Sequence, residues 1–453
     1  MADNLTFAEF FARFSKVERR RGYFRLRFAG IQLYGLLRVR LFYAIAQELG
    51  LFDNPHPNFE KPELDAAIAR IENLAIVPQA ETVIVPFRRR VAGAEPYSDR
   101  IREQLVAAGK HPLVLDFLPS ETDPSALDLT RLREYFAREH EAWANQILRV
   151  KSRRPAELLY HFMIRGFERE FGVTLEKFHK YPQWLIRRTL VEQRGFAELF
   201  TAMGTKKLYI VNAYSEQSIV LGAKQAGVKV YEVQHGFISP MHPAYAFDKL
   251  IGRRRVDAAP QVILTWGEFW GSGIKLARGT STQVSGPTRP FAEYRQRVAE
   301  LDRGTRQVLF SSQGAIGPQL CRIAIEAARK LPKHEVIFRL HPNESLDDYI
   351  ALAQSINHAE GRNLPSNFML SHKEPIFLDL LASSEYVIGA FSTTLYEALA
   401  LGCKVLALPL PGYENLQPSI DAGDITLISN LEDITLLMRQ AKPAEHPERY
   451  YAK

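Results

Sequence analysis

The feature that most constrains the fold is a regular alternation of short apolar segments with longer helical ones. In the first half of the chain the apolar segments are ETVIVPF (81–87), HPLVLDF (111–117), KLYIVNA (207–213), VKVYEVQ (228–234) and QVILTWG (261–267). The helical segment DRIREQLVAAGK separates the first two, and a strand, helix, strand order is the signature of a parallel α/β layer. The stretch from about 128 to 203 is helical by pattern. This half therefore predicts an α/β domain with a parallel sheet.

The alternation restarts at Gln307 and runs through QVLFSS (307–312), HEVIFRL (334–340), NFMLS (367–371), EYVIGAF (385–391) and KVLALPL (404–410). A chain of 453 residues is long enough for such a second domain. We therefore predict an α/β fold of two Rossmann-like, doubly wound domains that face a cleft. The expected boundaries are a basic helical extension at 1–60, a first domain at 61–270, a hinge rich in glycine, serine and threonine at 271–305, a second domain at 306–430 and a C-terminal helix or tail at 431–453.

Composition is that of a soluble globular protein, with 46% hydrophobic and 24% charged residues. No signal peptide and no apolar run of membrane-spanning length is visible, so we expect a cytoplasmic protein. The two cysteines, Cys321 and Cys403, exclude a disulfide framework and a cysteine-rich zinc site.

The first forty residues form a basic pole in a chain of net charge +7. Nine cations lie there among many aromatic and apolar residues: Arg13, Lys16, Arg19, Arg20, Arg21, Arg25, Arg27, Arg38 and Arg40. Two interpretations stand side by side. Either this segment lies on an anionic membrane surface, or it packs on its own domain with a solvated basic face. No nucleic-acid-binding module accompanies the charge, so nucleic acid is not expected as a partner.

Polar residues follow several predicted strands, where open parallel sheets bind ligands. In the second half, Ser311, Ser312 and Gln313 end the first strand, Arg339 and His341 end the next, and Phe391, Ser392 and Thr393 lead from EYVIGA into a helix. A helix start with hydroxyl groups suits a phosphate, and Glu397 one turn later suits ribose hydroxyls. The competing interpretation is a capping box formed by Thr394 and Glu397, which needs no ligand.

Histidines stand at two strand ends. His341, before Pro342, can donate to a phosphate oxygen with Arg339 as a nearby cation, although a structural role is an alternative for such a residue. In the first half, His235 lies between Gln234 and Gly236, and His242 follows. Gly236 permits close backbone approach or a positive φ, and a neutral imidazole is a suitable general base.

Other chemistry is less well supported. His242 and His235 lack a third metal ligand at convincing spacing, so no metal is expected. Neither GxGxxG nor GxxxxGK[ST] occurs, which argues against dinucleotide-dependent redox enzymes and P-loop nucleotidases. Glu95, Asp116 and Glu216 lie near strand ends in the first half and are further candidates for the base.

Together these residues resemble the GT-B glycosyltransferases of bacterial surface polysaccharides. The likeness rests on Gln234-His235-Gly236, on Arg339-Leu340-His341-Pro342, and on Ser392-Thr393 before a helix with Glu397. CDP-glycerol glycerophosphotransferases, and the sialyl and Kdo transferases of capsule and lipopolysaccharide that share a histidine-proline motif, have the most similar patterns. The chain departs from the glycerophosphotransferases at Gly389-Ala390-Phe391, where they have aspartate before tyrosine and two serines.

The resemblance implies a metal-independent glycosyl transfer from a nucleotide-activated sugar, with no other cofactor, to a surface-polysaccharide or lipid-linked acceptor. It implies that the second domain binds the donor and the first the acceptor. The donor-binding residues would be Ser311, Ser312, Gln313, Arg339, His341, Ser392, Thr393 and Glu397. His235 would be the catalytic base, with Glu216 and Glu95 as alternatives, and Gln234, Gly236 and His242 would lie on the acceptor side. A nucleotide-sugar epimerase and a non-catalytic, membrane-associated scaffold are the competing functions.

Overall fold

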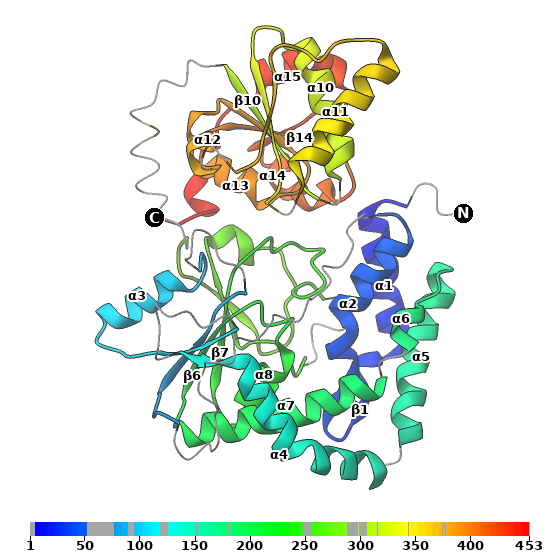
Figure 1. Ribbon diagram of the computed structural model, residues 1–453, viewed down its shortest axis with the longest axis vertical. Coiled ribbons are helices and arrows are strands. Elements are labelled where there is room, and N and C mark those ends of the chain that lie inside the picture. Colours follow the sequence, from blue (N-terminus) through cyan, green and yellow to red (C-terminus); the bar gives the residue numbers. More distant parts are fainter. Residues whose placement is uncertain are drawn as a thin grey trace.

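The computed structural model describes residues 5–51, 77–88, 95–117, 126–150, 153–179, 182–247, 255–287, 298, 306–314, 316–342, 344–373, 375 and 377–452. The proline-punctuated linker expected at 54–63, the start of the first domain at 61–76 and most of the expected hinge lie outside these residues. Figure 1 shows the chain as two α/β units, one above the other.

The first domain is built on a parallel sheet in the order β5-β4-β3-β6-β7-β8-β9. Its strands are β3 (Thr82–Val85), β4 (Leu113–Asp116), β5 (Leu127–Asp128), β6 (Lys207–Val211), β7 (Lys229–Val233), β8 (Val262–Thr265) and β9 (Ser281–Val284). Its helices are α1 (Phe7–Arg21), α2 (Leu33–Glu48), α3 (Asp99–Ala107), α4 (Leu129–Val150), α5 (Arg153–Phe171), α6 (Glu176–His179), α7 (Pro182–Ala202) and α8 (Gln217–Gln225), with short 3-10 turns η1 (Tyr23–Arg25) and η3 (Glu268–Gly271).

The second domain has a parallel sheet in the order β12-β11-β10-β13-β14-β15. Its strands are β10 (Gln307–Ser311), β11 (Glu335–Arg339), β12 (Phe368–Ser371), β13 (Tyr386–Gly389), β14 (Lys404–Ala407) and β15 (Ile425–Leu427). The helices are α10 (Gly317–Lys330), α11 (Leu346–Glu360), α12 (Phe377–Ser383), α13 (Thr393–Ala400), α14 (Gln417–Asp421) and α15 (Ile434–Gln440), with 3-10 turns η5 (Tyr413–Leu416), η6 (Leu431–Asp433) and η7 (Pro447–Arg449).

Helices cover both faces of this second sheet, and the alternation of side chains along a strand shows how. Val308 and Phe310 of β10 face a core shared with α10, α11 and α15, whereas Leu309 between them faces a core shared with α12 and α13. Because both faces are buried, every residue of the strand is apolar or buried. The predicted fold class, an α/β protein of two Rossmann-like domains with a helical N-terminal segment, is confirmed.

Two of the expected boundaries need correction. Strand β9 pairs with β8 inside the stretch expected to be a hinge, so the first domain continues beyond residue 270. The C-terminal segment is also more than a tail, because it returns to the first domain: Trp270 Nε1 donates to Tyr450 O at 2.7 Å and Ala452 N donates to Trp266 O at 2.8 Å. On its other side Tyr450 Oη donates to Asp424 of the second domain at 2.5 Å.

The N-terminal helices belong to the core of the first domain. The rings of Phe10 and Phe14 on α1 are fully buried against Phe42 of α2 and against Phe167 and Phe171 of α5. The described part of residues 1–60, residues 5–51, is therefore not a separate extension but part of the first domain. The aromatic residues that the sequence offered as a membrane-facing surface are the ones that hold these helices to their own domain.

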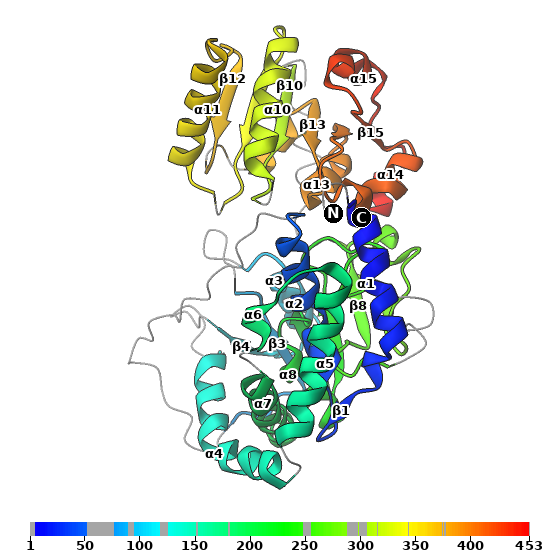
Figure 2. The same ribbon diagram turned by 90° about the vertical axis from the view of Figure 1, so that its right-hand side faces the viewer.

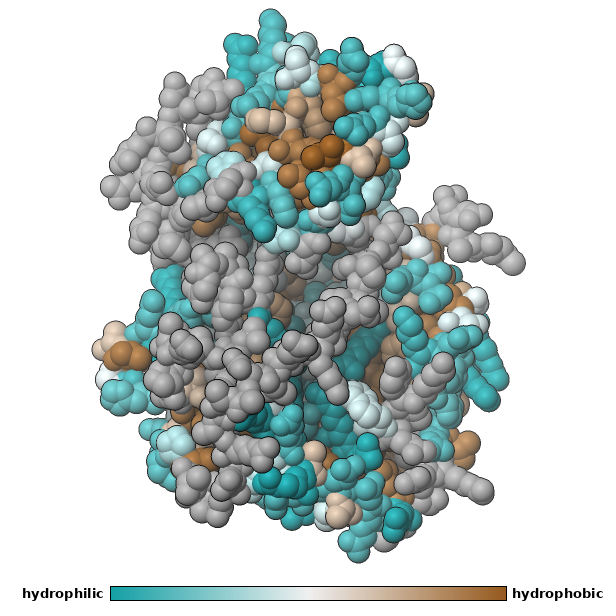
Figure 3. Space-filling view, viewed as in Figure 1, coloured by the Kyte–Doolittle hydropathy of each residue, from teal (hydrophilic) through white to brown (hydrophobic). Residues whose placement is uncertain are grey.

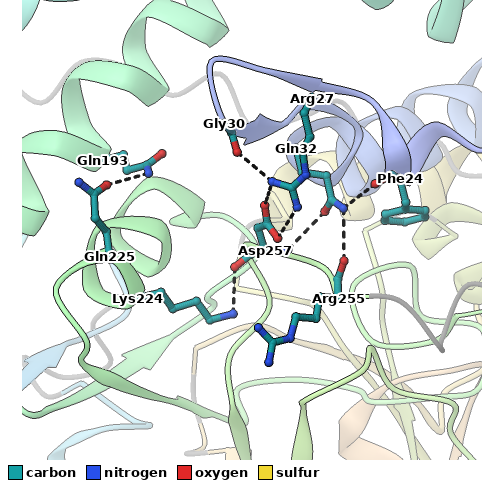
Figure 4. A network of polar contacts seen from close by, with 9 residues as sticks. All are labelled: Phe24, Arg27, Gly30, Gln32, Gln193, Lys224, Gln225, Arg255 and Asp257. Carbon is teal, nitrogen blue, oxygen red and sulfur yellow. Dashed lines mark hydrogen bonds and ion pairs between the residues drawn. The ribbon is translucent and has the colours of Figure 1, made fainter.

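A hairpin between these two helices is tied to the same domain. It consists of β1 (Arg27–Phe28) and β2 (Ile31–Gln32), which pair antiparallel. Arg27 forms a bidentate pair with Asp257 at 2.6 and 2.9 Å, and Gln32 donates to Arg255 O at 3.3 Å (Figure 4). Lys224 of α8 donates to Asp257 O at 2.9 Å. The hairpin and the α8 side of the sheet are thus joined through one loop.

This packing predicts that Phe14→Ala destabilises the first domain by about 3–5 kcal/mol, because a fully buried ring would leave a cavity. Urea unfolding measures the change. Ala12→Ser, on the exposed side of the same helix, is the control and should change the free energy of unfolding by no more than about 0.5 kcal/mol. Equal stability of the two variants would contradict the placement of α1 in the core.

Candidate functional site

The strand order places two switch points in the molecule. Numbered within its own domain, the second sheet runs 3-2-1-4-5-6, and the first sheet runs 3-2-1-4-5-6-7. In both, neighbouring strands 1 and 4 have connections that leave in opposite directions, and ligands bind in the crevice beyond their carboxyl ends. These positions follow β3 and β6 in the first domain and β10 and β13 in the second.

His235 lies beside the first switch point, directly after β7. Its ring is surrounded by Phe87, which follows β3, by Tyr214, which follows β6, and by Tyr97, with ring centroids 5.5, 5.7 and 6.1 Å away. Its Nε2 is 3.2 Å from Tyr214 Oη. Sequence reasoning missed Tyr214, although it stands just beyond the strand KLYIV, where the rule on strand ends would have found it.

Burial sets the charge of the two histidines. It lowers the pKa of His235 to about 4 and that of His242 to about 3, with His235 and Arg38 as further causes for His242. Both imidazoles are therefore neutral at pH 7. Nδ1 of His242 accepts a hydrogen bond from Ala244 N at 3.1 Å, so this side chain supports its own turn. Burial also raises the pKa of Tyr214 well above its usual value, so its phenol stays protonated, and its oxygen can accept a hydrogen bond from Nε2–H of His235.

Glu232 is a buried carboxyl group that sequence reasoning also missed. It lies on β7, is 1% exposed, and accepts hydrogen bonds from Tyr245 Oη at 2.9 Å and from Ala213 N at 3.0 Å. Burial raises its pKa to about 7. An acidic residue inside the apolar run VKVYEVQ was the available signal, because a charged residue on a doubly covered strand is rarely placed there without a partner.

A buried ion pair holds the loop that carries His242. Arg38 of α2 binds Glu18 of α1 through Nε at 2.5 Å and Nη2 at 3.1 Å, and both side chains are almost completely buried. The same guanidinium donates to the carbonyl oxygens of Pro243 and, at 2.9 Å, of Ala246. The N-terminal helices thereby fix the turn at 242–246.

At the second switch point, Ser392 is the N-cap of α13, and its side chain accepts from Thr394 N at 3.2 Å. The capping box expected from Thr394 and Glu397 is therefore wrong, because the helix begins two residues earlier. Thr393 is the first helical residue and is half-buried, whereas Glu397 is buried one turn further on. Gln313, after β10, accepts from Phe391 N at 3.1 Å and so joins the two strand ends.

His341 lies at the neighbouring strand end and is half-exposed. Its backbone N donates to Glu344 Oε2 at 2.6 Å, and Glu344 Oε1 accepts from Ser312 Oγ at 2.9 Å and from Tyr349 Oη at 2.5 Å. Glu344 thus ties the turn after β11 to the buried Ser312 after β10, and Ser311 at the end of β10 is also buried. The sequence analysis had not singled it out.

Two of the predicted site residues, Gln234 and Arg339, have structural roles instead. Gln234 is completely buried: its amide accepts from Trp266 N at 2.8 Å and donates to Gly236 O at 3.0 Å, so it cannot contact an acceptor. The guanidinium of Arg339 donates to the end of β12 and the loop after it: to Ser371 Oγ at 2.8 Å and to the carbonyl oxygens of Lys373 and Pro375 at 3.0 Å. It is therefore not a cation aimed at a phosphate.

The alternative candidates for the catalytic base, Glu216 and Glu95, also have ion-pair or hydrogen-bond partners within the protein. Glu216 is paired with Arg133 at 2.5 Å and with Arg88 at 3.5 Å, so its carboxylate is not placed to take a substrate proton. Glu95 accepts from Ser98 Oγ at 2.6 Å and from Tyr97 N at 3.2 Å, and burial raises its pKa. It holds the loop that brings Tyr97 to His235. Asp116 ends β4, the strand on the far side of β3 from β6.

Gly236 has a different role from one of those expected. Its φ is not positive, and a Cβ at this position would meet no atom within 4 Å. The backbone beside His235 therefore borders open space, which leaves room for close approach of a ligand.

The loop after β7 joins the two switch points. Phe237, two residues after His235, packs against Tyr396 of α13 with ring centroids 5.4 Å apart. Ser239 Oγ donates to Asn415 Oδ1 of η5 at 2.6 Å, in a buried contact. In Figure 1, α13 and α14 lie on the side of the second domain that faces the first. The His235 loop and the α13 helix thus meet at one interdomain contact.

Within the part of the chain that the structure describes, no group of three or more histidine, cysteine, aspartate or glutamate side chains is placed to hold a metal ion.

Comparisons with known proteins find similar structures but no similar sequences. No family model matches the chain, and no curated protein matches it. UDP-GlcNAc 2-epimerase from Neisseria meningitidis, solved with UDP-GlcNAc, is 14% identical, with a TM-score of 0.44 over 82% of this chain and 92% of that one. MurG from Acinetobacter baumannii is 11% identical, with a TM-score of 0.42 over 80% and 90%. HepE from Anabaena, solved with UDP and glucose, is 12% identical, with a TM-score of 0.41 over 80% and 89%. Likeness at this level says nothing about the site or the reaction.

The buried Glu232 predicts a distinct pH dependence of stability. Below its ordinary pKa of 4.5 the carboxyl is protonated in both states, and toward pH 7 only the unfolded chain releases the proton. The contribution of this protonation difference to the free energy of unfolding, about 3 kcal/mol, is therefore lost as pH rises from 4.5 to 7. Above pH 7 the free energy of unfolding changes little through this group.

Glu232→Gln keeps both hydrogen-bond acceptor contacts and removes the titration. Urea unfolding of the two proteins between pH 4.5 and 8 measures the difference between their free energies of unfolding. The wild type should become less stable relative to the variant as pH rises. The histidines titrate equally in both proteins and cancel in this comparison. A difference independent of pH would contradict a neutral Glu232.

Proposed function

We propose that this protein is a GT-B glycosyltransferase that moves a sugar from a nucleotide-activated donor to a surface-polysaccharide or lipid-linked acceptor. One observation carries the proposal. A histidine kept neutral beside one switch point and a hydroxyl-capped helix start at the other belong to elements that touch, through Phe237 and Tyr396. Such an arrangement supplies a base and a phosphate site to one reaction.

In the proposed reaction an acceptor hydroxyl oxygen attacks the anomeric carbon of the donor sugar. The new glycosidic bond forms as the bond from that carbon to the phosphate oxygen breaks, and the nucleotide leaves with the electron pair. His235 accepts the proton of the attacking hydroxyl, a contribution worth about 10²–10⁴-fold in rate for general bases. Tyr214 Oη would orient the imidazole by accepting from Nε2–H, which leaves Nδ1 as the nitrogen that takes the proton.

The leaving phosphate would lie at the start of α13. The positive end of the helix dipole favours an anion there, and the hydroxyls of Ser392 and Thr393 would turn to donate to it, with Ser392 giving up its contacts with Thr394. These fixed groups would stabilise the charge that develops on the phosphate oxygen, so the proposed transfer needs no metal ion. His341 would add a donor from the next strand end, and Glu397 would lie toward the ribose.

Donor binding would also prepare the base. With a pKa of about 4, His235 is neutral but a weak proton acceptor. A negatively charged nucleotide bound nearby favours the protonated imidazole and raises its pKa toward neutrality, where a general base is most effective. The histidine would therefore become an effective base only when the donor is present.

The acceptor part of the proposal rests on the resemblance carried by His235-Gly236 and His341-Pro342. An acceptor of this class would be presented at the inner face of the cytoplasmic membrane. A nucleotide-sugar epimerase would use the same two strand-end sites but no acceptor, so analysis of products formed without an acceptor separates the two reactions.

The donor half of the site is tested by nucleotide binding. CMP, CDP, UDP and GDP are added separately, and the unfolding temperature is measured. One nucleotide should raise it, because a ligand that binds only the folded protein stabilises it by mass action. In Ser392→Ala the rise at a given nucleotide concentration should shrink, while in Ser355→Ala, on the exposed side of α11, it should not. No response to any nucleotide would count against a donor site.

The base is tested in the transfer reaction with the responding nucleotide's sugars. His235→Ala should lower kcat by at least about 100-fold and leave the nucleotide-induced rise in unfolding temperature intact. His358→Ala, an exposed histidine of α11, is the matched control and should behave as wild type. Unchanged transfer by His235→Ala would remove the assignment, and unchanged binding without transfer in the wild type would support a non-catalytic scaffold.

A further inference from the structure

Helices α1 and α5 lie side by side on the outer face of the first domain (Figure 2). They run antiparallel: Phe10 near the start of α1 contacts Phe171 at the end of α5, and Tyr23 just after α1 contacts Phe162, with ring centroids 5.3 and 5.8 Å apart. The sides of α1 and α5 that face each other are therefore packed together and buried. The sides that face neither the neighbouring helix nor the core of the domain are exposed to solvent, and together we call them the α1–α5 face.

The solvent side of α5 carries two large apolar side chains followed by two cations. Leu158 is 68% exposed and Phe162 is 45% exposed. Arg165 and Arg169 are also exposed. The spacing of four, three and four residues places all four side chains in one stripe along the helix.

The solvent side of α1 is strongly basic. Four exposed cations lie there, Lys16, Arg19, Arg20 and Arg21, whereas Arg13 is exposed but turned to α5, where it donates to Glu170 O at 2.7 Å and pairs with the Glu170 carboxylate at 3.8 Å. Glu18 does not offset them at the surface, because it is buried and paired with Arg38, which leaves Glu9 as the exposed acid of this helix. The guanidinium of Arg21 lies 5.7 Å from the ring centroid of Phe162, so the basic surface and the apolar residues are continuous.

We propose that the α1–α5 face docks on an anionic lipid bilayer, with Leu158 and Phe162 entering the headgroup layer and the surrounding cations contacting lipid phosphates. Charge complementarity supports this occupant, since six exposed cations besides the Glu170-paired Arg13 share one face with two exposed apolar side chains. In Figure 3 this face is seen edge-on along the right of the first domain, where both hydrophobic and hydrophilic residues are visible. The surface is separate from the strand-end site, so the proposal is independent of glycosyl transfer.

No helix among the described residues is long and apolar enough to cross a bilayer.

A nucleic acid fits this face less well. Its phosphates would pair with the cations, but its polar backbone offers no apolar environment to Leu158. The boundary between headgroups and acyl chains offers both an anionic layer and an apolar one at the same depth. The docking surface also differs from the one that the sequence suggested, because the phenylalanines of α1 are buried and the exposed apolar side chains belong to α5.

Vesicle flotation of the full chain tests the electrostatic part. The probes are vesicles of phosphatidylcholine with phosphatidylglycerol and vesicles of phosphatidylcholine alone. Wild type should bind the anionic vesicles only, and more weakly as salt is raised. Replacing Lys16, Arg20 and Arg169 by Gln should lower the affinity about fivefold for each cation and about 100-fold in all.

The matched control removes the same charge elsewhere. Lys333, Arg362 and Arg439 are exposed cations of the second domain, and their replacement by Gln should leave vesicle affinity within about twofold. Equal loss in both triple variants would mean that net charge alone drives binding, which would overturn a specific face. Unfolding temperatures of the variants confirm that each is folded.

The apolar part is tested with Leu158→Ser, which should weaken binding about tenfold by keeping a large side chain out of the membrane. Its control is Leu436→Ser, on an exposed residue of α15, which should have no effect. The proposal fails if wild type does not float with anionic vesicles, if it binds single-stranded RNA instead, or if Leu158→Ser abolishes self-association measured by sedimentation but not vesicle binding.

Discussion

The ion pair between Glu18 and Arg38 is the contact on which the arrangement of the first domain most depends. A buried pair gains little net stability over apolar residues, but removing one partner leaves an uncompensated buried charge. Here the arginine has a second task, because it also binds the carbonyl oxygens of Pro243 and Ala246. The pair therefore joins α1, α2 and the loop after β7 into one unit, and the position of His242 follows from it.

That loop is in turn the link between the domains. It leaves β7 at Gln234, whose amide bridges to Trp266, and it reaches the second domain through Phe237 and Ser239. The C-terminal segment makes a second link through Tyr450, which contacts Trp270 of one domain and Asp424 of the other. Two connections of this kind restrict how far α13 can move from His235, which matters for any reaction that uses both.

The alternation of strands and helices was readable from the sequence because doubly covered strands must be apolar, and all ten apolar segments form strands. The strands that were missed are short or exposed: β9 (Ser281–Val284) is largely exposed, and β1, β2, β5 and β15 have only two or three residues each, too few for a clear apolar signal. The sequence predicted where these strands end along the chain, but not the direction in which each side chain points. Gln234 and His235 are neighbours, yet the Gln234 amide bridges strand ends in the interior, whereas the His235 ring lies among Phe87, Tyr97 and Tyr214. Arg339 likewise turns back into its own domain, a choice made by loop carbonyls far away in sequence.

The N-terminal segment shows the same limit from another side. Its periodicity indicated an amphipathic helix, but periodicity does not say whether the aromatic side meets lipid or protein. The decisive partners, Phe167 and Phe171, lie more than a hundred residues away on α5 and are visible only in three dimensions. Once they take up the aromatic side of α1, its cations remain at the surface beside Leu158 and Phe162. The helix therefore contributes charge to the outer face, while the apolar residues of that face come from α5.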